Sequence, residues 1–156
     1  MVDFAENYTL QPQNDIQSQY YHLDQVSIMV HITYRHGEDC TEENRVILKE
    51  YQFYISDGRC YELDFVQHSF QLFYKHLEDN NIQMEQHWIW SDGCVGQFKN
   101  SFVFQWLCIL DKRHKVLHIW NYFETKHEKG EHDRGGASIK TALCRKEMKF
   151  TTILLI

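Results

Sequence analysis

The stretch His87-Trp88-Ile89-Trp90-Ser91-Asp92-Gly93 sets the interpretation of the whole chain. Its three consecutive large apolar residues, flanked by polar ones, are typical of a strand that is buried on both faces. The strand leads directly into an acidic residue and a glycine turn, and α/β sheets bind ligands at the carboxyl ends of their strands. Asp92 is therefore the first candidate for a functional residue. The alternative is an Asp-Gly turn with a solvated carboxylate, which the dipeptide alone favours.

Composition indicates one ordinary domain with a core of its own. The 156 residues include one proline and seven glycines, and we find no linker, repeat or low-complexity segment. We expect a core over residues 1–150 and an apolar tail over residues 151–156. The five cysteines form no C-x-x-C pair, which favours reduced thiols in the nucleus or cytoplasm over a secreted disulfide frame. No apolar run approaches the ~20 residues needed to cross a bilayer, so we expect no membrane partner.

Apolar periodicity predicts the elements of secondary structure. They are half-buried strands over 26–34 and 46–55, further strands over 87–90 and 114–123, a helix over 61–79, a helix marked by Phe98, Phe102, Trp106, Ile109 and Leu110, and a last helix over 133–148. The opening Met1-Val2-Asp3-Phe4-Ala5 looks like the end of a strand whose beginning is missing, because a strand usually has ~5 to 6 residues. We expect a long loop from residue 6 to residue 24. The alternative is that Asp3 is an exposed terminal residue.

The predicted order of these elements, βββαβαβα, is that of the ribonuclease H-like fold. In that fold a mixed five-stranded sheet with flanking helices has its first and fourth strands side by side at the centre. Asp3 would then lie beside Asp92, and neighbouring carboxylates can bind divalent cations. A third acid could be Glu128, Glu131 or Asp133, and spacing does not choose among them. Asp133 is also a plausible N-cap of the last helix.

Three ordered motifs carry a resemblance to a known group of proteins. They are Asp3-Phe4-Ala5-Glu6-Asn7-Tyr8, Ser91-Asp92-Gly93 with Gln97-Phe98-Lys99-Asn100, and His127-x-Lys129-Gly130-x-x-Asp133-x-x-Gly136-x-x-Lys140. Together they resemble transposon-derived proteins similar to DDE/D transposases and integrases, and the resemblance spans residues 3 to about 148. It implies that Asp3, Asp92 and Asp133 are the three catalytic acids and that they bind Mg²⁺ or Mn²⁺ in a two-metal site. The implied activity is DNA strand cleavage and transfer at transposon ends and target DNA, in the nucleus, by a homodimer or a larger assembly.

Four basic residues of the motifs are candidates for contact with DNA phosphates. His127 and Lys129 match basic residues that precede the third acid in this group. Lys99 lies near the start of one predicted helix, and Lys140 lies within the last one. For each the alternative is a solvent-facing polar side chain. The formal net charge of −6 also argues against a nucleic-acid ligand, because such proteins usually carry a basic face.

Two further residues of the motifs have structural interpretations. Asn100 is expected to cap the helix that follows it rather than to contact a ligand. Gly136 is expected to let the last helix approach the sheet closely.

Two other functions stay open on the sequence. Glu128 and Arg134 stand where similar sequences usually carry glycine, which favours an inactive transposon-derived module that binds proteins or nucleic acid. A ribonuclease or structure-specific nuclease on the same fold is the other possibility, because a fold does not fix its substrate.

Overall fold

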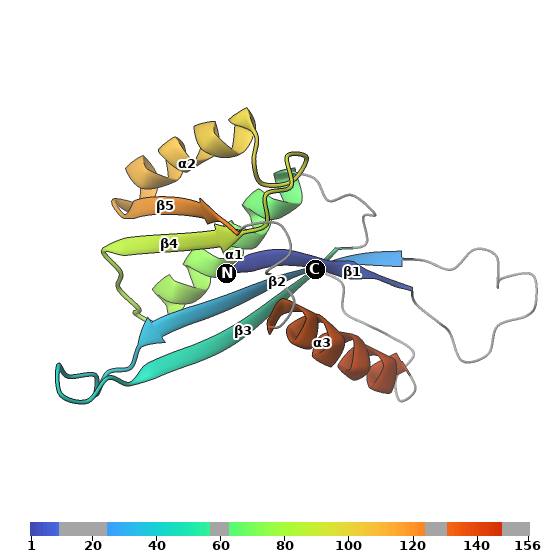
Figure 1. The fold of residues 1–156 in the computed structure, drawn as a ribbon, viewed down its shortest axis with the longest axis horizontal. Coiled ribbons are helices and arrows are strands. Elements are labelled where there is room, and N and C mark those ends of the chain that lie inside the picture. The colour runs from blue at the N-terminus through green and yellow to red at the C-terminus, as the bar shows by residue number, and fades with distance from the viewer. Residues whose placement is uncertain (10–24, 57–62, 124–130, 148–156) are drawn as a thin grey trace, which may run out of the picture. The chain divides into compact units, whose positions relative to one another are not determined.

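The computed structural model describes residues 1–9, 25–56, 63–123 and 131–147. In chain order its elements are β1 (Val2–Thr9), β2 (Gln25–His36), β3 (Ile47–Ser56), α1 (Leu63–Asp79), β4 (Gln86–Ser91), α2 (Ser101–His114), β5 (Leu117–Tyr122) and α3 (Glu131–Glu147) (Figure 1). The chain is a mixed α/β protein, and its elements follow the predicted order. It divides into two compact units, of which the first comprises residues 1–57 with 130–156 and the second residues 58–129. In the described ranges, no helix combines the length and the hydropathy needed to cross a membrane.

Hydrogen bonds join the five described strands into two sheets rather than the single five-stranded sheet that we predicted. One sheet has the order β1-β2-β3 and the other consists of β4 and β5. Each strand pairs with its neighbour in sequence, because β2 and β3 form a hairpin and β4 and β5 are joined by the crossover helix α2. The predicted pairing of the first and fourth strands would join the two units and stays a prediction.

The sheet of the first unit is antiparallel throughout. β1 continues to Thr9, so the predicted loop from residue 6 is wrong over residues 6–9, and a register shift between Ala5 and Tyr8 marks an irregularity in the strand. β2 is buried on both faces from Val26 to Ile32, which corrects the half-buried strand predicted from its alternating pattern. The pattern misled because the residues between the aliphatic ones, such as Ser27 and His31, are buried as well.

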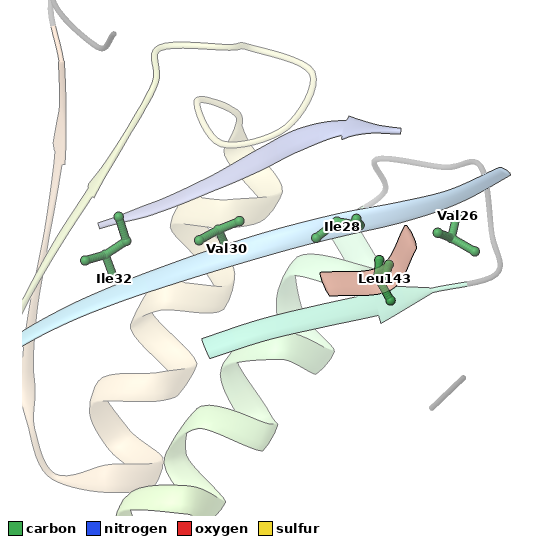
Figure 2. Close-up of a cluster of buried hydrophobic side chains, with 5 residues drawn as sticks. All are labelled: Val26, Ile28, Val30, Ile32 and Leu143. Carbon is green, nitrogen blue, oxygen red and sulfur yellow. The ribbon is translucent and has the colours of Figure 1, made fainter. Parts of the chain in front are cut away.

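The core of the first unit lies between the sheet and α3. Val26, Ile28, Val30 and Ile32 form a row along β2, and α3 adds Leu143 to the cluster (Figure 2). All five side chains are buried, and each fully buried aliphatic side chain contributes about 1.5–3 kcal/mol relative to an exposed one. This apolar contact holds α3 against the sheet.

Two glycines set how closely α3 approaches the sheet. A Cβ atom added to Gly136 would lie 3.2 Å from the Cβ atom of Ala5 in β1. A Cβ atom added to Gly135 would lie 3.4 Å from the side chains of both Tyr51 and Val30. The predicted role of Gly136 is confirmed, because a larger residue at these positions would push the helix away from the strands.

The second unit packs its apolar residues around the parallel β4–β5 pair. Its largest fully buried side chains include Phe70, Ile89, Phe98, Val103 and Leu110. The prediction that β4 is buried on both faces was wrong. Ile89 and Ser91 are buried, whereas Trp88 and Trp90 on the opposite face are 55% and 37% exposed. A run of apolar residues does not reveal whether anything covers the second face of a strand.

The phase of α2 also differs from the prediction. Val103, Trp106 and Leu110 face the core, whereas Phe102 and Ile109 are exposed. The prediction selected the largest apolar side chains of the segment. The buried face of the helix instead consists of residues with i, i+3, i+7 spacing.

Candidate functional site

Asp3 lies within β1, on the face of the first unit's sheet that α3 covers. In the β1–β2 register Asp3 is opposite Val30 and Ala5 is opposite Ile28, and side chains of directly opposed residues share one face. Val30 and Ile28 belong to the cluster beneath α3. Asp3 is half-buried, and one of its carboxylate oxygens accepts a 2.8 Å hydrogen bond from the amide of Phe4.

Asp133 lies in the first turn of α3 and is exposed. It is not the N-cap, because the helix begins two residues earlier, at Glu131. Gly135, two residues after Asp133, lies against Val30, which is the cross-strand neighbour of Asp3. The structure therefore brings the start of α3 and the Asp3 position to the same face of the first unit's sheet. An acid in the first turn is also stabilised by the amide groups of the helix start.

Asp92 directly follows β4 in the second unit, as predicted. One of its carboxylate oxygens accepts a 3.2 Å hydrogen bond from the amide of Cys94, so the side chain closes a local turn of the Asx type. Asp92 is half-buried and Cys94 is exposed. The carboxylate is thus at the carboxyl end of the strand and within reach of solvent.

Lys99 lies at the same end of the β4–β5 pair. Its ammonium group is 5.3 Å from the ring centroid of Tyr122, and Tyr122 is the register partner of Ser91. The Tyr122 hydroxyl donates a 3.0 Å hydrogen bond to the carbonyl of Phe98. Asn100 caps α2 by accepting a 3.0 Å hydrogen bond from the amide of Val103, which confirms the structural role predicted for it. Lys99, the start of α2 and Asp92 therefore lie at the same end of the β4–β5 pair.

Two of the remaining candidate residues lie in α3. Lys140 lies in α3, two turns after Asp133, and is half-buried. His127, Lys129 and Glu128 lie outside the described residues. Glu131 is the first residue of α3.

Asp3 and Asp133 belong to the first unit and Asp92 to the second. In the part of the chain that the structure describes, no three His, Cys, Asp or Glu side chains are grouped so that they could hold a metal ion. The two-metal site for Mg²⁺ or Mn²⁺ therefore stays a prediction.

The second unit contains a hydrogen-bonded network that sequence reasoning missed. The Tyr74 hydroxyl lies 2.8 Å from Nδ1 of His87 and 2.6 Å from Nε2 of His118. Nδ1 of His118 lies 2.5 Å from a carboxylate oxygen of Asp111, which also accepts a 3.0 Å bond from the His118 amide. Four elements, α1, β4, α2 and β5, each contribute one residue.

Burial shifts the pKa values of two groups in this network. Burial, with a smaller contribution from the neighbouring His118, lowers the pKa of His87 to about 3. Burial raises the pKa of the Tyr74 hydroxyl, and the carboxylate of Asp111 adds to that shift. One arrangement of protons satisfies all three contacts: Asp111 accepts the His118 Nδ1 proton, His118 Nε2 accepts the Tyr74 hydroxyl proton, and that hydroxyl oxygen accepts the His87 Nδ1 proton.

No sequence signal pointed to this network, because Tyr74 and His118 are 44 residues apart. The two histidines are register partners at the amino ends of their strands, and that register follows only from the fold.

The three candidate acids lie within one family match. Residues 1–154 match the model of a family described as a domain of unknown function, DUF8701. The chain belongs to the DUF8701 family. The DUF8701 match covers described elements of both units, including the segments that carry Asp3, Asp92 and Asp133. No curated protein and no solved structure matches the chain.

Proposed function

We propose that the chain is a DDE/D-type transposase core with a ribonuclease H-like fold, which cleaves and transfers DNA strands with divalent metal ions. The observation that carries this proposal is the placement of the acids on the elements. Asp3 lies in β1 under α3, Asp133 lies in the first turn of α3, and Asp92 directly follows β4. The order βββαβαβα of the described elements supports the same assignment.

The carboxylates are suited to the metal ions that this chemistry needs. Mg²⁺ and Mn²⁺ prefer oxygen ligands, and Asp3, Asp92 and Asp133 offer such oxygens from two strands and a helix. When bound, a pair of ions activates the attacking oxygen and stabilises the leaving oxygen. The activity requires all three acids to serve the same pair of ions.

Contact with the DNA backbone falls to basic residues in this proposal. Lys99 is exposed, and Asn100 beside it caps the start of α2, where backbone amides and a cation favour a phosphate. Lys140 in α3, with His127 and Lys129 of the sequence motif, would add further contacts. Because transposition joins two transposon ends to a target, we propose that a homodimer or larger assembly acts on DNA in the nucleus.

Manganese-dependent nicking of DNA tests this function. We expect the full chain to nick supercoiled DNA with Mn²⁺, and Asp92→Asn to lower the rate by at least about a hundredfold, because changes outside the direct ligands already cost ~10- to 100-fold. Asp79→Asn is the matched control, since Asp79 is an exposed acid at the end of α1. Equal nicking by Asp92→Asn and the original chain would reject Asp92 as a ligand.

An inactive binding module is the second candidate, and one observation favours it. On the open face of the β4–β5 pair, Trp88 and Leu117 are 55% and 52% exposed, and the Trp90 ring lies 5.3 Å from that of Phe123. Exposed apolar groups of this kind are typical of interaction sites. Absence of nicking by the original chain, with the fold intact, would favour this function.

A further inference from the structure

A buried serine connects β5 to the backbone of Asp92. The side chain of Ser91 is fully buried. Its oxygen accepts a 2.9 Å hydrogen bond from the indole nitrogen of Trp120, and its hydroxyl donates a 3.0 Å hydrogen bond to the carbonyl oxygen of Asp92. Both functions of the hydroxyl are thus used, as burial of a hydroxyl without loss of stability requires.

The indole of Trp120 is held in place by an aromatic cluster. Its ring centroid lies 5.6 Å from that of Phe70, 6.1 Å from that of Phe98 and 6.5 Å from that of Trp106. Packed aromatic rings occupy single rotamers. The indole N–H therefore has a fixed direction toward Ser91.

Two further hydrogen bonds act on the same strand end. The carbonyl oxygen of Ser91 accepts a 3.0 Å bond from the amide of Phe123, and a carboxylate oxygen of Asp92 accepts the bond from Cys94. The peptide before Asp92, the carbonyl of Asp92 and its side chain are each held by a different partner. Such support is what a metal ligand at a strand end needs, because small displacements of a ligand are costly.

We propose that Ser91 and Trp120 are positioning residues, which present the carboxylate of Asp92 to a divalent cation in one orientation. The inference rests on the proposed function of Asp92. The Trp120 indole holds the Ser91 hydroxyl in place, and this hydroxyl holds the Asp92 carbonyl. The hydrogen bond from the Cys94 amide keeps the Asp92 carboxylate on one side of the turn. Loss of either residue frees the backbone at Asp92 without removing a group that touches the ion.

Backbone dynamics test the structural half of this inference without reference to activity. In Ser91→Ala and in Trp120→Phe, we expect the NMR order parameters of the Asp92 and Cys94 amides to fall from about 0.85 toward about 0.6. Trp88→Phe is the matched control, because it removes an indole from the opposite, exposed face of β4, and it should leave both amides rigid. Unchanged order parameters in both test variants would overturn the inference, whatever the activity.

Metal dependence tests the functional half. We expect the Mn²⁺ concentration for half-maximal nicking to rise at least about tenfold in Ser91→Ala and Trp120→Phe, with KM for DNA unchanged. A lower rate at saturating Mn²⁺, with an unchanged half-saturation point, would show a merely structural role and contradict positioning. Absence of nicking by the original chain would instead reject the proposed function of Asp92, a failure that is distinct from unchanged order parameters.

Discussion

At the amino-terminal end of the β4–β5 pair, His87 and His118 both contact the Tyr74 hydroxyl inside the second unit. At the carboxyl end of the same two strands, Asp92 is half-buried and Lys99 is exposed. One end satisfies its polar groups with each other, and the other end leaves charged groups within reach of solvent. A single pair of strands therefore separates groups that stabilise the fold from groups that are available to a ligand.

Burial has a different consequence at each end of the strand pair. Burial disfavours the charged form of His87, so this ring contributes a hydrogen bond and no charge. Ser91 is also buried, but its bonds lead to the backbone of Asp92, whose carboxylate remains accessible. Changes at the amino end should therefore alter stability, and changes at the carboxyl end should alter ligand binding.

Removal of the Tyr74 hydroxyl is expected to have the largest effect on stability. Tyr74→Phe leaves nitrogens of His87 and His118 without their partner, and each buried unsatisfied group costs about 1–3 kcal/mol. We predict that urea denaturation will show a loss of about 2–4 kcal/mol in the free energy of unfolding. Tyr122→Phe, at the opposite end, should cost only about 1 kcal/mol. Equal losses of stability in the two variants would contradict the proposed difference between the two ends of the strand pair.

Stability should depend on pH through His87. Its pKa is about 3 in the folded chain and 6.5 in the unfolded chain, so the unfolded state binds more protons than the folded state between these values. The stabilisation from neutral His87 is fully present above pH 6.5 and is lost as the pH falls toward 3. We expect a slope of about 1 kcal/mol per pH unit below pH 6, measured as urea denaturation at several pH values.

His87→Gln should remove this part of the pH dependence. Identical slopes for His87→Gln and the original chain would show that His87 contributes nothing to it.

The smallest expected effect concerns Lys99 at the open end. If Lys99 contacts a phosphate, Lys99→Met should weaken binding of DNA and lower the slope of log affinity against log salt by about 1. Lys75→Met, which removes an exposed lysine from α1, is the matched control. The free energy of unfolding should stay unchanged in both variants. An unaltered salt slope in Lys99→Met would remove Lys99 from the DNA-contact residues.

Some of the fold followed from local pattern. The role of Gly136 was predictable from a glycine inside a helix, although its contact with Ala5 joins residues that are distant in the sequence. The order of elements and the cap at Asn100 were predictable because each depends on a few neighbouring residues. The turn that holds Asp92 was predictable for the same reason. The element order, the cap and the turn depend on interactions between nearby residues, so they can be predicted from the sequence.

Other features depend on contacts between distant residues. The exposure of Trp88 depends on what covers the second face of β4, and no residue of the strand encodes that. The bond between Trp120 and Ser91 depends on a parallel register that joins residues 29 positions apart. The two-sheet pairing also differs from prediction, because element order alone does not specify which strands form hydrogen bonds.

A titration of the full chain with Mn²⁺ tests the central proposal most directly. The original chain should bind a pair of ions, as two-metal catalysis requires, and Asp3→Asn, Asp92→Asn and Asp133→Asn should each weaken binding at these same sites. Asp79→Asn should bind as the original chain does. If Asp92→Asn binds Mn²⁺ with unchanged affinity while Asp3→Asn does not, the three acids do not share one metal site and the proposed function is contradicted.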